Sequence, residues 1–281
     1  MAVKVAVINM KGGVGKSTLT ANLAWQFAAY TKWAKNVLVV DLDPQFNVSQ
    51  YLLGPKEYQK LIDKGQRTTW DVLEQGTATP TGGKSPMLAP TDVICNVVTF
   101  VNNAKIDLIP SRLELAWSLR NPAQKERKIA NLINKVDKQY DLILVDCAPT
   151  ESMLTTAAYH ACDYVLVPVV PEYLSSIGLP LLAKSISEFE EQNETKTVDV
   201  IGIIFNATED YTPEETKAKA EVKAFAKSEG IPVFSAEVKY SKSYAKGARE
   251  GKPIFRTSYA RTSVASQFHQ FASEFATKAG L

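Results

Sequence analysis

A segment near the start of the chain combines glycines, lysines and hydroxyl side chains in a way that suits phosphate binding. Residues 9–18 read Asn-Met-Lys-Gly-Gly-Val-Gly-Lys-Ser-Thr and lie between an apolar run (Val3–Ile8) and a helix-like segment (Leu19–Tyr30). Glycines allow backbone N–H groups to approach an anion, and the first turn of a helix adds unpaired N–H groups. Lysine can reach the β- and γ-phosphates of a nucleotide, and a serine hydroxyl is an oxygen ligand for Mg²⁺. The predicted nucleotide-binding residues of this loop are Lys11, Gly12, Gly13, Val14, Gly15, Lys16, Ser17 and Thr18.

The loop differs from the ordinary P-loop in two respects. The pattern G-x-x-x-x-G-K-[ST] requires glycine at position 10, where the chain has Met10. The loop also contains a second lysine, Lys11, in addition to Lys16. A strand before it, a helix after it and two lysines inside it favour a nucleotide-binding loop over a glycine-rich turn that binds nothing.

Three carboxylates follow apolar runs, where strands are expected to end. Asp41 and Asp43 end the run that starts at Val37, and Asp146 ends the run that follows Asp141. Ligand-binding residues of an open parallel sheet gather at the carboxyl ends of its strands, so we expect these side chains beside the loop. Phosphoryl transfer to water needs a held phosphate, a metal ion and a group that orients the water. Ser17 is predicted to ligate Mg²⁺, and Asp146 to support the metal through a water.

Asn206 ends a later strand at the same predicted edge of the sheet. Its side-chain amide is able to pair with the edge of an adenine base. An ordinary Asx turn, in which the amide bonds to nearby backbone, is the alternative for this residue.

Strand-like and helix-like segments alternate along the chain and would position these side chains. The predicted strands are 3–8, 37–43, 105–110, 141–146, 164–170, 200–206 and 233–238, and the predicted helices are 19–30, 113–138 with a possible break at Pro122, 152–161, 175–192, 213–228 and 262–278. Residues 77–90 hold three prolines and two glycines and are predicted to be a loop. The alternation predicts an α/β fold, a doubly wound, mostly parallel sheet with helices on both faces, in a single domain of residues 1–281.

Composition argues against several classes of protein. The chain has 281 residues, of which 45% are hydrophobic and 22% charged, and its net charge is +2, as in ordinary globular proteins. No apolar run approaches the roughly 20 residues of a membrane span, and the start lacks a signal-peptide apolar region. Cys95, Cys147 and Cys162 are far apart and fit neither a disulfide framework nor a zinc site. We therefore expect a cytoplasmic protein with no membrane contact.

The double-lysine loop resembles the deviant Walker A box of the ParA/MinD superfamily of ATPases. Further segments resemble ParA partition proteins in the same order along the chain, namely residues 69–73, 108–116, 145–149, 164–173 and 238–255. Residues 77–103 match least. The resemblance implies a P-loop NTPase fold, ATP and Mg²⁺ as cofactors, and a homodimer that forms when ATP is bound.

The resemblance also implies roles for individual residues. Lys16 would serve the bound nucleotide, whereas Lys11 would reach the nucleotide of the partner subunit. The segment Val-Asp-Leu-Asp-Pro-Gln, residues 40–45, looks like the family's second box, Walker A′. In that box the second aspartate, here Asp43, positions the attacking water, and Asp41 belongs to the metal shell. The implied catalytic residues are Lys11, Lys16 and Asp43, and a base-reading role for Asn206 rests on the same resemblance.

Basic residues cluster toward the C-terminal end of the chain. Between Lys239 and Arg261, seven basic residues accompany the single acid Glu250. Clustered lysines and arginines neutralise DNA phosphates without reading sequence, which makes binding salt-dependent; a solvated charged surface is the alternative. With the ParA resemblance over this segment we favour DNA, with Lys239, Arg249 and Arg256 as the best individual candidates. The full predicted set is Lys239, Lys242, Lys246, Arg249, Lys252, Arg256 and Arg261.

Members of this superfamily differ in the surface to which they bind. A MinD-type protein ends in a basic amphipathic helix that inserts into lipid, whereas the last predicted helix here carries Phe268, Phe271 and Phe275 at core-packing spacing. We expect a ParA-type ATPase, associated with the nucleoid, that forms an ATP-dependent sandwich dimer and binds non-specific DNA. It would partition or position a plasmid, chromosome or protein cargo, and a ParB-like or other adaptor protein would stimulate its slow hydrolysis. The alternative is an ATP-dependent cargo clamp or scaffold, or a MinD-like positioning ATPase, that binds no DNA.

Overall fold

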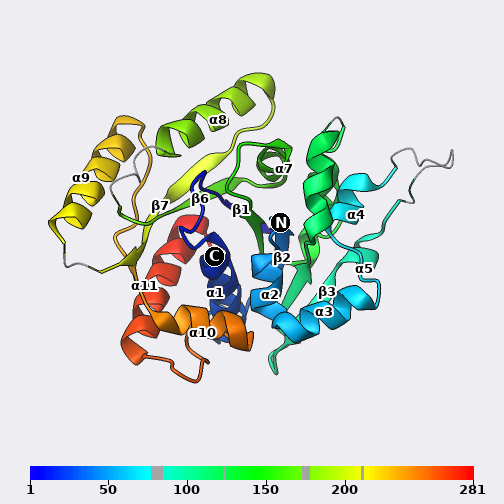
Figure 1. Ribbon diagram of the computed structural model, residues 1–281, viewed down its shortest axis with the longest axis horizontal. Coiled ribbons are helices and arrows are strands. Elements are labelled where there is room, and N and C mark those ends of the chain that lie inside the picture. Colours follow the sequence, from blue (N-terminus) through cyan, green and yellow to red (C-terminus); the bar gives the residue numbers. More distant parts are fainter. Residues whose placement is uncertain (77–84, 86, 123, 173–177, 210–211) are drawn as a thin grey trace.

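A single mixed sheet lies at the centre of the structure (Figure 1). The computed structural model describes residues 1–76, 85, 87–122, 124–172, 178–209 and 212–281. Within these residues the sheet has eight strands in the order β3-β4-β2-β5-β1-β6-β7-β8. The strands are β1 (Val3–Val7), β2 (Val37–Leu42), β3 (Cys95–Thr99), β4 (Lys105–Ile109), β5 (Leu142–Cys147), β6 (Tyr164–Val169), β7 (Asp199–Thr208) and β8 (Val238–Lys239). All neighbouring strands are parallel except β3 and β4, which confirms the predicted mostly parallel sheet.

The central strands are apolar on both faces because helices cover both sides of the sheet. Every residue of β2 and of β5 is buried, as expected for parallel strands rich in Val, Ile and Leu. The register places Asp41 of β2 opposite Asp146 of β5, and Asp146 opposite Val7 of β1. The three strands therefore end at one level, where the loop after β1 meets the carboxylates.

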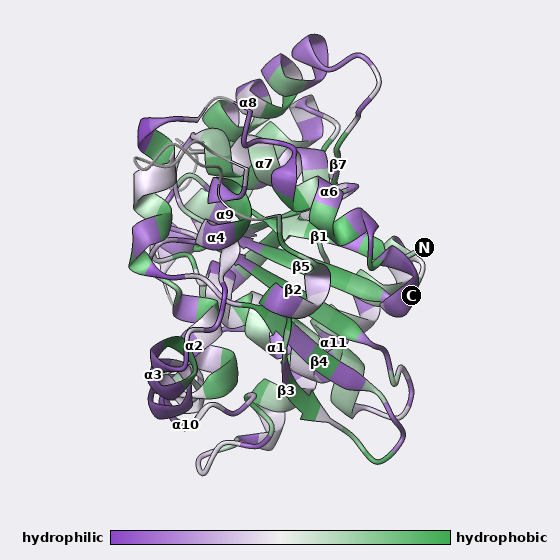
Figure 2. Cartoon of the chain, turned by 90° about the vertical axis from the view of Figure 1, so that its right-hand side faces the viewer, coloured by the Kyte–Doolittle hydropathy of each residue, from purple (hydrophilic) through white to green (hydrophobic). Residues whose placement is uncertain are grey.

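Two layers of helices enclose this sheet. One buried cluster joins one face of the sheet to α4, α6, α7, α8 and α9, and a second joins the other face to α1, α2 and α11. Figure 2 shows apolar strands between helices whose outward sides are hydrophilic. The helices are α1 (Lys16–Ala29), α2 (Asn47–Leu53), α3 (Pro55–Asp63), α4 (Thr69–Glu74), α5 (Pro90–Val93), α6 (Lys128–Asn134), α7 (Met153–Ala161), α8 (Gly178–Gln192), α9 (Pro213–Ser228), α10 (Lys242–Glu250) and α11 (Thr262–Ala279).

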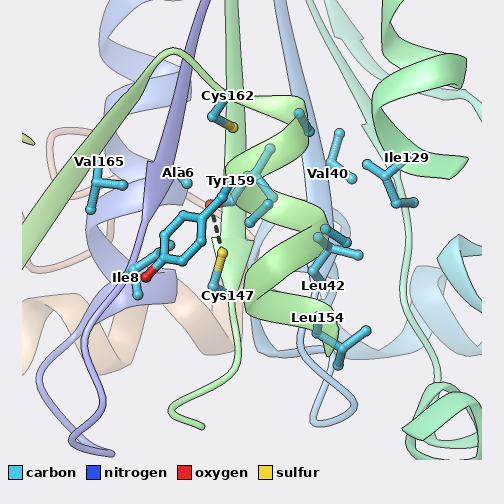
Figure 3. Packing of buried hydrophobic residues seen from close by; sticks show 14 of the residues in the cluster. Ala6, Ile8, Val40, Leu42, Ile129, Cys147, Leu154, Tyr159, Cys162 and Val165 are labelled. Carbon is cyan, nitrogen blue, oxygen red and sulfur yellow. Dashed lines mark hydrogen bonds between the residues drawn. The ribbon is translucent and has the colours of Figure 1, made fainter. Parts of the chain in front are cut away.

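The packing of α7 shows how the first cluster supports the central strands. Figure 3 shows Leu154 and Tyr159 of α7 beside buried side chains of the sheet, including Cys147 of β5 and Ile8, which follows β1. Tyr159 is 1% exposed, and its hydroxyl lies 3.0 Å from Ser185 Oγ of α8, which gives the buried polar group a partner. A fully buried large apolar side chain contributes about 1.5–3 kcal/mol to stability, so this layer fixes the strand ends firmly.

The predicted long helix over residues 113–138 is wrong in part. The structure has a 3-10 helix, η1 (Leu113–Arg120), then α6, then a short 3-10 helix, η2 (Asp137–Gln139). The break begins at Asn121, which takes φ −134° and ψ 78°, before Pro122. Proline disfavours a helical conformation in the residue before it, so the possible break at Pro122 is confirmed and the continuous helix is not.

The predicted strand over residues 233–238 is also wrong in part. Only Val238–Lys239 forms β8, and Val233 makes an isolated bridge with Ile203. The intervening backbone N–H groups of Ser235 and Ala236 donate to the Glu274 carboxylate of α11, each at 3.0 Å. Ser235 and Ala236 therefore interrupt the pairing with β7 that Val233 and Val238 make on either side of them.

Some elements lie outside the predictions, and some predictions lie outside the described residues. Helices α2, α3, α4, α5 and α10 and the antiparallel strand β3 were not expected from the sequence. Residues 77–84 and 86 of the predicted loop, and residues 175–177 of the predicted helix 175–192, are outside the described part of the chain. Among the described residues, no helix combines the length and the apolar character that a membrane span requires.

Candidate functional site

The glycine-rich loop joins β1 to α1, as the sequence predicted. Gly15 precedes the first turn of α1 with φ 86°, and Gly13 has φ 77°; both conformations favour glycine. A Cβ atom on Gly15 would lie 2.2 Å from Asn206 Nδ2, whereas a Cβ on Gly13 would meet nothing within 4 Å. Position 15 therefore requires glycine for two reasons, its backbone angle and the amide beside it.

Lys16 is held inside the loop rather than extended into solvent. The residue is 6% exposed, and its Nζ donates to the carbonyl oxygens of Asn9 (3.1 Å) and Lys11 (3.2 Å). Burial lowers the pKa of Lys16, while the nearby Asp146, Cys147 and Asp43 oppose that shift. A buried ammonium group whose hydrogen bonds go to neutral carbonyls is poised for an anion, which fits the predicted phosphate role.

Asp146 and Ser17 form the pair that the sequence predicted to hold a metal ion. Ser17 Oγ donates to Asp146 Oδ2 at 2.6 Å, and Thr20 Oγ1 donates to Oδ1 at 3.2 Å. Burial raises the pKa of Asp146 to about 7, and the neighbouring Asp43 adds to the rise. No cluster of three or more His, Cys, Asp or Glu side chains suited to a metal occurs in the described residues. A single buried carboxylate beside a hydroxyl fits Mg²⁺, which keeps waters and substrate phosphates as most of its ligands.

Asp41 accepts hydrogen bonds from the loop that follows β2 and from α2. Its Oδ1 accepts from the backbone N–H of Asp43 (3.0 Å), and its Oδ2 accepts from the backbone N–H (3.0 Å) and hydroxyl (2.6 Å) of Ser49. Burial raises the pKa of Asp41, and the charge of Asp146 raises it further. Both carboxylate oxygens thus already fix the Asp43 loop and the first turn of α2, while the predicted role in the metal shell stays a prediction.

Asp43 faces the pocket that the loop forms. The residue is 6% exposed, and its Oδ1 accepts from the backbone N–H of Gln45 at 2.8 Å, which orients the carboxylate. The pocket has a volume of about 530 Å³. Its walls are Gly12, Gly13, Gly15, Lys16, Ser17, Thr18, Asp43, Gln45, Asn47, Gln50, Tyr51, Pro55, Pro149, Ala248 and Arg249. The volume lies within the range of about 300–1,000 Å³ that is usual for small-molecule sites.

Other predicted site residues lie behind or beside these walls. Asn206 Nδ2 donates to the carbonyl oxygen of Val14 at 2.7 Å, so the amide braces the loop. Lys11 Nζ lies 2.7 Å from Glu172 Oε2, and its side chain is one-third exposed. The structure therefore gives Asn206 a contact with the loop, and its predicted contact with adenine stays a prediction.

Sequence reasoning missed the wall that α2 and α10 provide. Asn47 and Gln50 of α2 line the pocket together with Ala248 of α10. Asn47 and Gln50 are three residues apart, which places two polar side chains on one face of a helix. That spacing, directly after Asp43 and Pro44, is the signal that was available in the sequence.

The predicted basic residues divide into two groups in the structure. Four of them, Lys242, Lys246, Arg249 and Arg261, line one pocket of about 570 Å³ together with Tyr240, Ser241, Ser243 and Tyr259. We call this the basic pocket. Lys252 lies 3.9 Å from Glu250, while Arg256 stacks over the rings of Trp25 and Phe100 at 5.6 and 5.7 Å. Lys239 lies on β8, so two of the three best individual candidates are not part of the pocket.

Known proteins resemble this chain along most of its length. A family model described as an AAA domain matches residues 2–199. An uncharacterised protein of Methanocaldococcus jannaschii is 31% identical over 90% of this chain and 91% of its own length. The sporulation initiation inhibitor protein Soj of Bacillus subtilis is 27% identical over 89% of each chain.

Solved structures agree in fold. A complex of ATP with a variant of McdA from Cyanothece superimposes with a TM-score of 0.77 at 16% identity, covering 100% of this chain and 97% of that one. Cobyrinic acid a,c-diamide synthase of Mycobacterium smegmatis with bound ADP and magnesium gives 0.72 at 22% identity, with coverage of 100% and 97%. Together with the double-lysine loop and the family match, these similarities show that the chain belongs to the ParA/MinD superfamily of P-loop ATPases.

Proposed function

We propose that this protein is a ParA-type ATPase that hydrolyses ATP slowly with Mg²⁺ and uses the nucleotide to control binding to DNA. The observation that carries the proposal is that Lys16, Ser17 and Asp43 line one pocket, with Asp146 bonded directly behind Ser17. These are the groups needed to hold a phosphate, hold a metal and orient water.

Each group in the pocket would have a separate role in ATP hydrolysis. The backbone of Gly12–Gly15 and the Lys16 ammonium hold the phosphates, and Asp43, fixed by Gln45, orients the attacking water. Mg²⁺, held by Ser17 with Asp146 behind it, would spread the charge that develops on the phosphate oxygens. Asn206 braces Val14 and so keeps the loop in its anion-binding shape.

Lys11 would act between subunits. Its ammonium group pairs with the carboxylate of Glu172, and the two side chains are 33% and 61% exposed. An ion pair at such exposure is worth about 0–1 kcal/mol. Lys11 can therefore leave Glu172 at little cost and reach the triphosphate of a second copy in an ATP-dependent homodimer.

DNA binding would use the basic pocket. Lys242, Lys246 and Arg249 are spaced by four and three residues, so they lie along one face of α10, and Arg261 joins them from the start of α11. Such a cluster suits phosphate neutralisation without base reading. Dimerisation would bring two basic pockets onto one DNA segment, and an adaptor protein would stimulate hydrolysis and release. In this proposal the protein works in the cytoplasm, on the nucleoid, as a single-domain subunit.

The test is DNA binding by the purified protein with ATP, with ADP and without nucleotide, at low and at high ionic strength. ATP should strengthen binding to duplex DNA of arbitrary sequence, and salt should weaken it steeply. Asp43→Ala should hold the protein in its ATP-bound, DNA-bound form because hydrolysis stops. Equal DNA affinity in all three nucleotide states would refute the switch. Absence of DNA binding, with ATP hydrolysis intact, would instead favour a cargo clamp or a positioning ATPase that uses another surface.

A further inference from the structure

Arg249 occupies a position that its predicted role in DNA binding does not explain. Among the described residues that line the nucleotide pocket and the basic pocket, Arg249 is the one common to both. It lies in the last turn of α10, next to Ala248, which lines the nucleotide pocket only. The two pockets are therefore neighbours, separated by the C-terminal end of this helix.

Close backbone packing fixes that end of α10 against α2. A Cβ atom on Gly247 would lie 2.8 Å from the hydroxyl of Tyr51, and one on Gly251 would lie 3.0 Å from the backbone nitrogen of Gly54. Gly251 also has φ 64°, which ends α10 in a left-handed conformation. Since glycine at both positions permits this approach, the backbone of Arg249 is held beside α2, while its side chain is exposed to solvent and available to a ligand.

A buried hydrogen-bond network ties the same region to the phosphate-binding helix α1. Asn22 of α1 donates from Nδ2 to the Tyr51 hydroxyl (2.9 Å) and accepts at Oδ1 from the backbone N–H of Ile254 (2.7 Å). The Tyr51 hydroxyl in turn donates to the carbonyl oxygen of Tyr244 in α10 (3.3 Å). The position of α10 relative to the glycine-rich loop is thereby set by buried polar contacts that are costly to break.

The charge around Arg249 points to an anionic ligand. In the described part of the chain no carboxylate forms an ion pair with its guanidinium, whereas its neighbours Lys246 and Lys252 lie 3.4 and 3.9 Å from Glu250. Arginine in a pocket wall binds phosphate through paired N–H donors. The same nucleotide pocket is lined by the phosphate-binding loop.

We propose that Arg249 is a phosphate-binding residue shared by the two pockets, contacting the nucleotide on one side and a DNA phosphate on the other. The half of this inference that concerns DNA rests on the proposed function, and the half that concerns the nucleotide does not. A cation placed between two anionic ligands reduces their mutual repulsion. Arg249 therefore allows one subunit to bind nucleotide and DNA at the same time, before any dimer forms.

The test measures nucleotide binding without DNA. A fluorescent ADP derivative is titrated into wild type, Arg249→Ala, Arg249→Lys and, as a matched loss of an exposed arginine that lines neither pocket, Arg120→Ala. Arg249→Ala should bind ADP about 10-fold more weakly, as expected for one charge-assisted contact. Arg249→Lys should recover part of the loss, and Arg120→Ala should match wild type. Thermal unfolding of each variant without ligand shows whether the fold is retained.

A second measurement tests the shared role. Duplex DNA is titrated into each variant with saturating ADP and without nucleotide. In wild type, ADP should change DNA affinity little, whereas in Arg249→Ala bound ADP should weaken it several-fold because the intervening charge is lost. If Arg249→Ala binds ADP as tightly as wild type, Arg249 does not contact the nucleotide. If Arg249→Ala binds ADP more weakly but bound ADP does not weaken its DNA affinity, Arg249 is not shared by the two pockets. If wild type binds ADP but binds no DNA with ATP, with ADP or without nucleotide, the proposed function fails while the ADP result for Arg249 still stands.

Discussion

Replacing Gly15 by alanine should distort the phosphate-binding loop more than the same replacement at Gly13. Both glycines have positive φ, so alanine costs about 1–2 kcal/mol at either position. At Gly15 the new Cβ would also lie 2.2 Å from Asn206 Nδ2, so the amide has to move. That movement breaks the 2.7 Å bond to the carbonyl oxygen of Val14, which costs about 1–3 kcal/mol more.

The expected loss of stability is therefore about 2–5 kcal/mol for Gly15→Ala and about 1–2 kcal/mol for Gly13→Ala. The assay is urea unfolding of the nucleotide-free protein, followed by circular dichroism. Nucleotide affinity, measured by calorimetry, should fall more for Gly15→Ala because its loop N–H groups lose their alignment.

The double variant Gly15→Ala with Asn206→Ala isolates the clash from the backbone strain. Removing the amide leaves room for the new Cβ, so the two substitutions together should cost less than the sum of their separate effects. Equal destabilisation by Gly13→Ala and Gly15→Ala, or strict additivity in the double variant, would refute the reasoning that Asn206 braces the loop.

Three further predictions follow from the site and its supports. Burial raises the pKa of Asp146 to about 7, above its ordinary value of 3.8. The native state therefore binds the carboxyl proton more tightly than the unfolded chain does. As a result, the nucleotide-free protein should lose stability as the pH rises from about 4 to about 7. The side chain of the Asp146→Asn variant cannot ionise, so this variant should lose up to about 4 kcal/mol less unfolding free energy than wild type over that pH interval, as measured by urea unfolding at each pH. If the stabilities of wild type and variant change in parallel with pH, the prediction is contradicted. Lys16→Ala should abolish nucleotide binding in calorimetry because no other lysine lines the described pocket wall. If the variant still binds nucleotide, another group holds the phosphates. Glu274→Ala should destabilise the protein by about 1–2 kcal/mol in thermal unfolding, because the backbone donors of Ser235 and Ala236 lose their acceptor; an unchanged midpoint would show that water replaces it.

The positions of the main strands and of the loop were readable from local pattern. Val37–Leu42 and Leu142–Cys147 are short apolar runs that contain or precede carboxylates, and such runs form buried parallel strands whose ends meet at one edge. Glycine spacing before a helix identified the loop itself. These features depend on residues that are close in sequence, so local pattern was sufficient to predict them.

Features that depend on tertiary partners could not be read in the same way. The backbone of Ser235–Ala236 has strand-like neighbours, yet its donors pair with Glu274, 38 or 39 residues later. The sequence predicts a place for Asp41 in the metal shell, which stays a prediction, but it does not show that Ser49 and the Asp43 backbone donate hydrogen bonds to both of its oxygens. Both outcomes are set by groups that arrive from other elements.

The basic segment shows the same limit at the level of function. Seven basic residues lie in one stretch, and the sequence favoured Lys239, Arg249 and Arg256 among them. Helix α10 aligns Lys242, Lys246 and Arg249 on one pocket, while Arg256 stacks on Trp25 and Phe100. Only the helix and its packing partners distinguish these side chains.

The most direct test of the central claim is sedimentation velocity with Mg²⁺ and a non-hydrolysable ATP analogue, comparing wild type with Lys11→Ala. Wild type should sediment as a dimer with the analogue and as a monomer with ADP. Lys11→Ala should still bind the analogue but stay monomeric, because its nucleotide site is intact while the cation that crosses to the partner is lost. Wild type that remains monomeric at saturating analogue, or Lys11→Ala that dimerises as well as wild type, would contradict the account.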